Sequence, residues 1–196
     1  VAIAPASNLA SILTIGEQQA STLPINYQIQ MLAQLDTYTA LIVAGMQGHN
    51  KSVTYNEVFK NDTVILAPIA EAECSSTVGV QLGTAMSIYA AGIGQGTLTG
   101  YGRLQSGFMS IPVIDTFLKK DSQPGLAPLN KKVFIYQGEA DTTVPKAATD
   151  LLIASMKANG TSASNIQYTT SAAWDHGTVY TQNYTSFVDN IDSLFQ

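Results

Sequence analysis

The 196-residue sequence has little charge and no long apolar run. Only 12% of the residues are Asp, Glu, Lys or Arg, the net charge is −5, and no Lys or Arg occurs before Lys51. A basic stripe that would neutralise phosphates is therefore missing, and we expect no nucleic acid among the partners. No apolar run has the length of a membrane span, so no transmembrane segment is expected. The 45% hydrophobic content is typical of a globular chain.

Cysteine and histidine are also scarce. Cys74 is the single cysteine, which excludes an internal disulfide and a cysteine-rich metal site. A lone thiol is most often a small buried hydrophobic side chain, and the alternative is a disulfide to a partner outside the chain. The two histidines, His49 and His176, lie far apart in sequence without a cluster of further ligands. We expect neither a metal nor another cofactor, and we expect His49 to be an exposed residue at a helix end.

The start of the chain and its sequons bear on localisation. No signal peptide is visible, and an apolar run of β type begins at the first residue, which indicates a start inside a structural element. Asn-x-Ser/Thr sequons begin at Asn50, Asn61, Asn159 and Asn183. Although a chain rich in Ser and Thr produces sequons by chance, they favour export, and we expect a secreted or periplasmic protein.

Three segments are typical of strands in a parallel sheet. The run over residues 1–5 is wholly apolar and predicts a strand buried on both faces, while residues 132–137 and 166–170 are rich in β-branched and aromatic side chains. A helix that begins near Pro145 and ends at Asn159-Gly160 lies between the second and third strands. The arrangement predicts a βαβ unit, followed by a terminal helix with an apolar stripe over residues 184–195.

The segment from Gly16 to Gly125 shows mainly helical periodicity. Apolar positions over residues 29–46 predict a long helix, Thr54 to Glu57 is a possible capping box, and residues 110–120 predict a further helix. Five glycines between residues 92 and 102 predict a turn, with a mobile gate over a pocket as the alternative. A connection this long is not a bare loop, so it predicts a helical cap or lid inserted between strands.

Two polar motifs directly follow two of the predicted strands. Gln137–Pro145 contains Asp141 and follows the second strand, and Trp174–Gly177 contains His176 and follows the third. Open α/β sheets place their sites at the carboxyl ends of parallel strands. A carboxylate that accepts a hydrogen bond from one imidazole nitrogen fixes the tautomer of the ring and stabilises its charged form. Trp174 is more often a packing residue than a substrate contact.

Simpler interpretations of these residues remain open at this point. Asp141 could bond its own backbone in an Asx turn, and His176 could brace the start of the last helix. Glu139 and Asp175 are competing carboxylates, the first nearer to the strand end and the second adjacent to the histidine in sequence. Neighbouring residues seldom point their side chains at each other, which favours Asp141 over Asp175 as the partner of His176.

The run Tyr136-Gln-Gly-Glu-Ala-Asp-Thr-Thr-Val-Pro145, followed by a helix, a strand and Asp175-His-Gly177, resembles the last third of an α/β-hydrolase. The sequence Phe134-Ile-Tyr-Gln-Gly-Glu-Ala-Asp141 and the large helical insert before this strand are similar to the secretory lipase family of the lipase A type. The closer similarity covers residues 131–196. The resemblance implies that Asp141 is the catalytic acid and His176 the catalytic histidine.

The resemblance also implies a fold class and a domain organisation. The fold is α/β, with residues 1–15 and 126–196 forming the C-terminal portion of an α/β-hydrolase parallel sheet. Residues 16–125 then form a large, mainly helical cap inserted between strands. Such a cap would line an apolar pocket for a small-molecule ester or lipid.

The sequence departs from the family at the nucleophile. No Gly-x-Ser-x-Gly motif occurs, so the resemblance implies that the serine belongs to an N-terminal segment, cleaved but associated or missing. We expect a serine hydrolase of carboxylic esters, an esterase or lipase, that is inert as this isolated chain. The alternatives are a serine peptidase or acyltransferase on the same fold, or a non-catalytic binding module that retains the scaffold.

Overall fold

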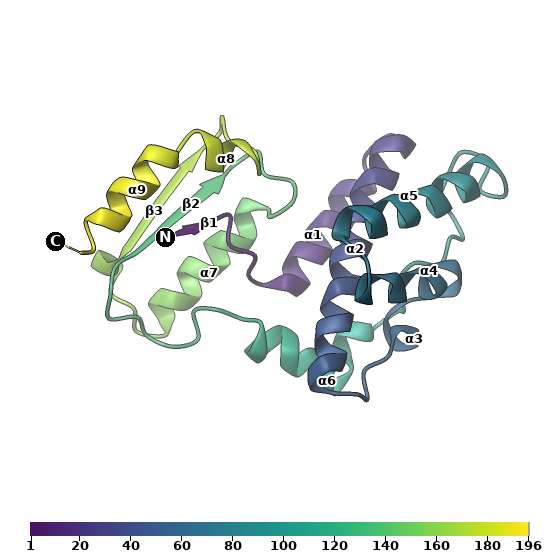
Figure 1. Cartoon of the computed structure of the whole chain (residues 1–196), viewed down its shortest axis with the longest axis horizontal. Coiled ribbons are helices and arrows are strands. Elements are labelled where there is room, and N and C mark those ends of the chain that lie inside the picture. The colour runs from purple at the N-terminus through teal and green to yellow at the C-terminus, as the bar shows by residue number, and fades with distance from the viewer. Residues whose placement is uncertain (196) are drawn as a thin grey trace. The chain divides into compact units, whose positions relative to one another are not determined.

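The computed structural model describes residues 1–195 and shows a mixed α/β protein, mainly helical, with a small parallel sheet. The chain divides into two compact units (Figure 1). Residues Val1–Ile15 and the chain from Leu118 onward form one, called here the sheet unit, and Gly16–Phe117 form the other, called the helical unit. The sequence placed the second boundary at Gly125. It falls earlier because residues 118–125 bond within the sheet unit, where Gln123 accepts from the Asn8 amide and Gly125 accepts from Ser155.

The sheet has three parallel strands in the order β1-β2-β3. They are β1 (Ala2–Ile3), β2 (Val133–Gly138) and β3 (Ile166–Ser171). The prediction of a fully buried strand over residues 1–5 is wrong, because only two residues pair with β2 and both are half-buried. Ala4 has a φ of 41°, in the left-handed region, and Pro5 follows without an amide hydrogen, so the ladder ends there.

Helices cover both faces of this sheet (Figure 1). On one face lie α8 (Thr178–Thr181) and α9 (Tyr184–Asp192), and on the other lies α7 (Lys146–Ala158). The sheet unit also contains η4 (Ala163–Asn165), the first residues of α1 (Leu9–Ala20) and most of the short helical turn η3 (Phe117–Asp121). The predicted terminal helix ends at Asp192 and is preceded by the separate α8.

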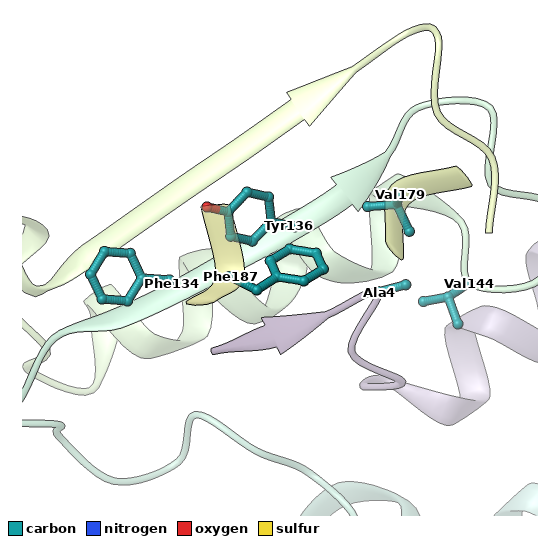
Figure 2. Close-up of a cluster of buried hydrophobic side chains, with 6 residues drawn as sticks. All are labelled: Ala4, Phe134, Tyr136, Val144, Val179 and Phe187. Carbon is teal, nitrogen blue, oxygen red and sulfur yellow. The ribbon is translucent and has the colours of Figure 1, made fainter. Parts of the chain in front are cut away.

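Side chains of β2 alternate between two apolar layers. Phe134 and Tyr136 lie in a cluster with Val179 of α8 and Phe187 of α9, and Tyr136 meets Phe187 edge to face (Figure 2). Ile135, one residue out of phase, packs on the opposite face with α7 side chains. Central β2 is thus buried on both faces, as the βαβ pattern predicts.

The helical unit contains one long helix and several shorter ones (Figure 1). They are α2 (Ile25–His49), α3 (Tyr55–Val58), α4 (Asn61–Leu66), η1 (Ala67–Glu71), α5 (Ser75–Ala91), η2 (Phe108–Ser110) and α6 (Pro112–Thr116). The expected capping box is present at the start of α3, where the Thr54 amide donates to Glu57 at 2.7 Å. The apolar pattern of the sequence does not predict α5, because its apolar residues lie on all sides of the helix: Val78 is buried, whereas Val80 is exposed.

Small residues bring α5 close to α2. A side chain at Gly79 would meet Thr37, and one at Gly83 would meet Ala33, so both glycines allow the two helices to approach. Cys74 precedes α5 and is exposed, which contradicts the expectation of a buried thiol. Because Cys74 lies at the start of α5, its side chain is not part of the face of α5 that packs on α2.

The glycine-rich segment after α5 forms a turn that folds back on the helix. The Tyr89 hydroxyl donates to the Thr99 carbonyl oxygen at 2.7 Å, and the Tyr89 ring packs on Tyr101. Across residues 1–195, none of the helices has both the length and the apolarity to cross a membrane.

Candidate functional site

The carboxyl ends of β2 and β3 lie side by side and carry the two motifs singled out in the sequence. β2 and β3 pair in parallel from Val133–Ile166 to Gly138–Ser171, so the loops that follow them leave the same edge of the sheet. Asp141 lies in the loop after β2, and His176 lies in the turn between β3 and α8. The topology therefore brings together residues 35 positions apart.

Asp141 and His176 are in direct contact. Asp141 Oδ2 and His176 Nδ1 are 2.9 Å apart, a normal hydrogen-bond distance. The Asp141 side chain is fully buried, whereas that of His176 is 47% exposed. Nδ1 is engaged with the carboxylate, and Nε2 has no hydrogen-bond partner among the residues that the structure describes. The pair thus consists of a buried acceptor and a ring with one nitrogen available to another molecule.

Asp141 also forms the Asx turn considered above. Its second oxygen, Oδ1, accepts from the backbone amides of Thr143 at 2.9 Å and Val144 at 2.8 Å. The two interpretations of Asp141 are therefore compatible, because each oxygen of the carboxylate serves one of them. The Asx turn fixes the carboxylate on the backbone, and the other oxygen, Oδ2, faces the imidazole.

Gly138 permits the close approach of the two loops. A Cβ atom at this position would lie 2.3 Å from the carbonyl oxygen of Trp174. In its absence, the amide of Ala140 donates to that same oxygen at 3.0 Å, and the amide of Glu139 donates to Ser171. These backbone hydrogen bonds hold the loop that carries His176 against the loop that carries Asp141.

The competing carboxylates bond elsewhere. Glu139 accepts from the Thr170 hydroxyl at 2.7 Å. Asp175 caps α8: its Oδ1 accepts from the amides of Gly177 and Thr178 and from the Thr178 hydroxyl. The bonds from Thr178 lower the pKa of Asp175 below its ordinary value of 3.8. Asp175, and not His176, therefore braces the start of α8.

Two residues of the site escaped the sequence analysis. Gln137 of β2 and Thr149 of α7 are both fully buried, and the Gln137 amide donates to Asp141 Oδ2 at 3.2 Å. A signal was available, because a glutamine near the end of an otherwise apolar buried strand must find hydrogen-bond partners. Its partners come from a loop and a helix, so the strand pattern did not identify them.

The remaining singled-out residues lie apart from this pair. His49 is the last residue of α2, in the helical unit, and is exposed. Trp174 is half-buried against the apolar cluster of the sheet unit, and its indole nitrogen donates to Gln182. Within the described residues, no three His, Cys, Asp or Glu side chains gather in a way that would hold a metal ion.

The helical unit has a groove of its own between α2 and α5. Its volume is about 720 Å³, and Ile29, Ala33, Val80 and Ile88 supply apolar walls. The other lining residues are Asn, Gln, Ser, Thr, Gly and Tyr, and none of the lining residues carries a charge. A neutral, apolar ligand suits such a surface better than a charged one.

A second buried carboxylate occurs in the helical unit. Asp36 is fully buried. Arg103 donates hydrogen bonds to both carboxylate oxygens of Asp36, from Nε at 2.9 Å and from Nη2. Arg103 Nη1 also reaches Glu17 at 3.3 Å. Burial raises the pKa of Asp36, and the Arg103 guanidinium opposes this shift. Burial alone would lower the pKa of Arg103, but the Asp36 carboxylate raises it overall.

Comparison of the chain with protein-family models, with curated proteins and with solved structures gave no match.

Proposed function

We propose that this chain supplies the acid and the histidine of a serine hydrolase that acts on carboxylic esters, on an α/β-hydrolase scaffold. The observation that supports the proposal most directly is the 2.9 Å contact between buried Asp141 and half-exposed His176 at the carboxyl ends of adjacent parallel strands. The nucleophilic serine would come from a segment that precedes this sequence.

The geometry suits the roles of orienting residue and base. A carboxylate on Nδ1 favours the tautomer with the proton on that nitrogen, which leaves Nε2 with a lone pair. His176 Nε2 would take the proton of the serine hydroxyl as its oxygen attacks the ester carbonyl. It would then give this proton to the departing alkoxide, and water would release the acid by the same two proton transfers.

The choice of an ester as substrate depends on a different set of observations. The chain has few charged residues, and the groove between α2 and α5 has no charged lining residue. A neutral, partly apolar substrate is compatible with both. Fold alone does not separate an esterase from a peptidase or an acyltransferase, so substrate profiling has to decide.

A fluorophosphonate probe tests the proposal, since it reacts with activated serines. We expect the complete gene product, including any chain encoded before Val1, to be labelled on a serine outside residues 1–196. His176→Ala should abolish labelling, and His49→Ala, at the exposed end of α2, should leave it unchanged. The proposal fails if the complete product is not labelled, or if labelling survives His176→Ala.

The rate of ester hydrolysis by the same proteins gives a second test of the proposal. Nitrophenyl esters of increasing acyl length should be hydrolysed, and peptide amides should not. Faster cleavage of peptide amides would replace the ester proposal by the peptidase alternative while keeping the same residues.

A further inference from the structure

Gln137 places a polar side chain in an apolar layer. It is the penultimate residue of β2, is fully buried, and shares the α7 face of the sheet with Ile135, which packs against Leu152 and Ile153. Burial of an amide is costly unless its oxygen and its nitrogen both find partners. The residue is therefore expected to serve a specific set of hydrogen bonds.

The structure gives the Gln137 amide partners on both sides. Oε1 accepts from the Thr149 hydroxyl at 2.7 Å. Nε2 donates to the carbonyl oxygens of Val144 at 2.9 Å and Gly138 at 3.0 Å, and to Asp141 Oδ2 at 3.2 Å. Because every group near Nε2 is an acceptor, rotation of the amide would bring Oε1 against other oxygens. Thr149 and these acceptors together fix one orientation of the amide.

The Asp141 oxygen that Gln137 contacts is the one that faces His176. Oδ2 receives both Gln137 Nε2 and His176 Nδ1, while Oδ1 receives the two backbone amides of the Asx turn. Val144 links the two sides, since its amide donates to Asp141 and its carbonyl oxygen accepts from Gln137. The carboxylate is thus held by donors from its own loop and from β2.

We propose that Gln137, oriented by Thr149, is a positioning residue that holds the Asp141 carboxylate in the plane in which it selects the Nδ1–H tautomer of His176. The inference rests on the proposed function, because it gives that pair its geometry. A glutamine that only satisfied the carbonyl oxygens of the loop would stabilise the fold without affecting the imidazole.

Nitrogen NMR of the His176 ring in the intact protein, at a pH where the ring is neutral, separates these roles. We expect the native protein to show a protonated Nδ1 whose hydrogen exchanges slowly with water. In Gln137→Leu the population should shift towards Nε2–H, and exchange should accelerate about tenfold or more, as expected for loss of a hydrogen bond to a charged group. Thr149→Val should shift the signals in the same direction, and Thr149→Ser should restore them.

Gln105→Leu is the matched control. Gln105 lies in the helical unit, where its amide donates to the carbonyl oxygens of Asn56 and Phe59, so this variant should leave the His176 spectrum unchanged. If Gln137→Leu fails to fold, Thr149→Val decides the question, because valine has nearly the shape of threonine.

The outcomes separate the inference from the proposed function. Folded variants that keep the native tautomer and exchange rate would overturn the role of Gln137 and leave the Asp141–His176 pair intact. A native protein in which Nε2–H predominates would overturn both. In the active protein, Gln137→Leu should lower kcat about tenfold with KM nearly unchanged, because only the orientation of the base is affected.

Discussion

In each unit of the molecule a buried carboxylate lies beside a basic partner, and the two pairs differ in the exposure of that partner. In the helical unit, Asp36 forms an ion pair with Arg103, whose side chain is only 13% exposed. In the sheet unit, Asp141 is equally buried, but its partner His176 is 47% exposed. Burial of an acid therefore does not by itself indicate a reactive site.

The donors around the two carboxylates differ as well. Arg103 supplies both hydrogen bonds to Asp36 through one rigid guanidinium, which is always charged. Asp141 collects donors from a loop, a strand and a ring that can gain or lose a proton. We infer that the first pair serves mainly the fold and that the second is built for proton transfer. The following predictions test this difference, from the largest expected effect to the smallest.

Asp141→Asn should lower the kcat for ester hydrolysis by about 10⁴-fold in the complete protein. The asparagine oxygen can keep the Asx turn, but its NH₂ group then faces His176 Nδ1 and favours the wrong tautomer. Steady-state kinetics measure the effect. The control Glu139→Gln, which alters a carboxylate bonded to Thr170, should keep turnover within a small factor of the native value. Equal losses in the two variants would remove Asp141 from the mechanism.

Asp36→Asn should instead lower stability, with a loss of about 3–5 kcal/mol of unfolding free energy, because Arg103 is left buried without its counter-charge. Urea denaturation followed by circular dichroism measures it. Glu17→Gln is matched, since Glu17 contacts the same guanidinium from a side chain that is 42% exposed, and it should cost about 1 kcal/mol or less. If Asp36→Asn lost less unfolding free energy than Asp141→Asn, the assignment of the two pairs would be reversed.

Gly138→Ala should cost about 1–3 kcal/mol, typical of overpacking, because the new methyl group overlaps the Trp174 carbonyl oxygen. The turn that carries His176 must move away, so the ester kcat should fall together with the stability. Gly45→Ala is the control. This glycine lies within α2, where an added Cβ would have no atom within 4 Å beyond its chain neighbours and the nearby backbone of its own helix, and alanine there should stabilise the helix by about 1 kcal/mol.

The smallest expected effect is on the contribution of Asp175 to stability at low pH. The pKa of Asp175 is lowered in the folded state by its bonds to Thr178, so the folded protein binds a proton there less readily than the unfolded chain. The stability that Asp175 contributes is present above its ordinary pKa of 3.8 and is lost as the pH falls through the lower folded value. The difference in unfolding free energy between native protein and Asp175→Ala should therefore shrink below pH 3.8. A difference that grows in acid would contradict the capping role.

Many of the secondary-structure elements of the sheet unit could be predicted from local sequence patterns. The β-branched run of β2, the Pro145 and Asn159-Gly160 boundaries of α7 and the apolar stripe of α9 are local signals, and the corresponding elements form. The short length of β1 could not be predicted, because it depends on the backbone conformation of Ala4. The helix α5 was missed, since its apolar residues do not favour one face.

The sequence by itself determined the order of strand, acid loop, helix, strand and histidine turn, because hydrophobic periodicity and turn residues act over short stretches of chain. The sequence favours Asp141, but only the tertiary structure decides that this carboxylate meets His176, since Glu139, Asp141 and Asp175 are all close to a strand end and differ in their partners. It also decided that Gln137 and Thr149 join the site and that Asp36 meets Arg103. Such contacts depend on packing between distant segments, which no local pattern encodes.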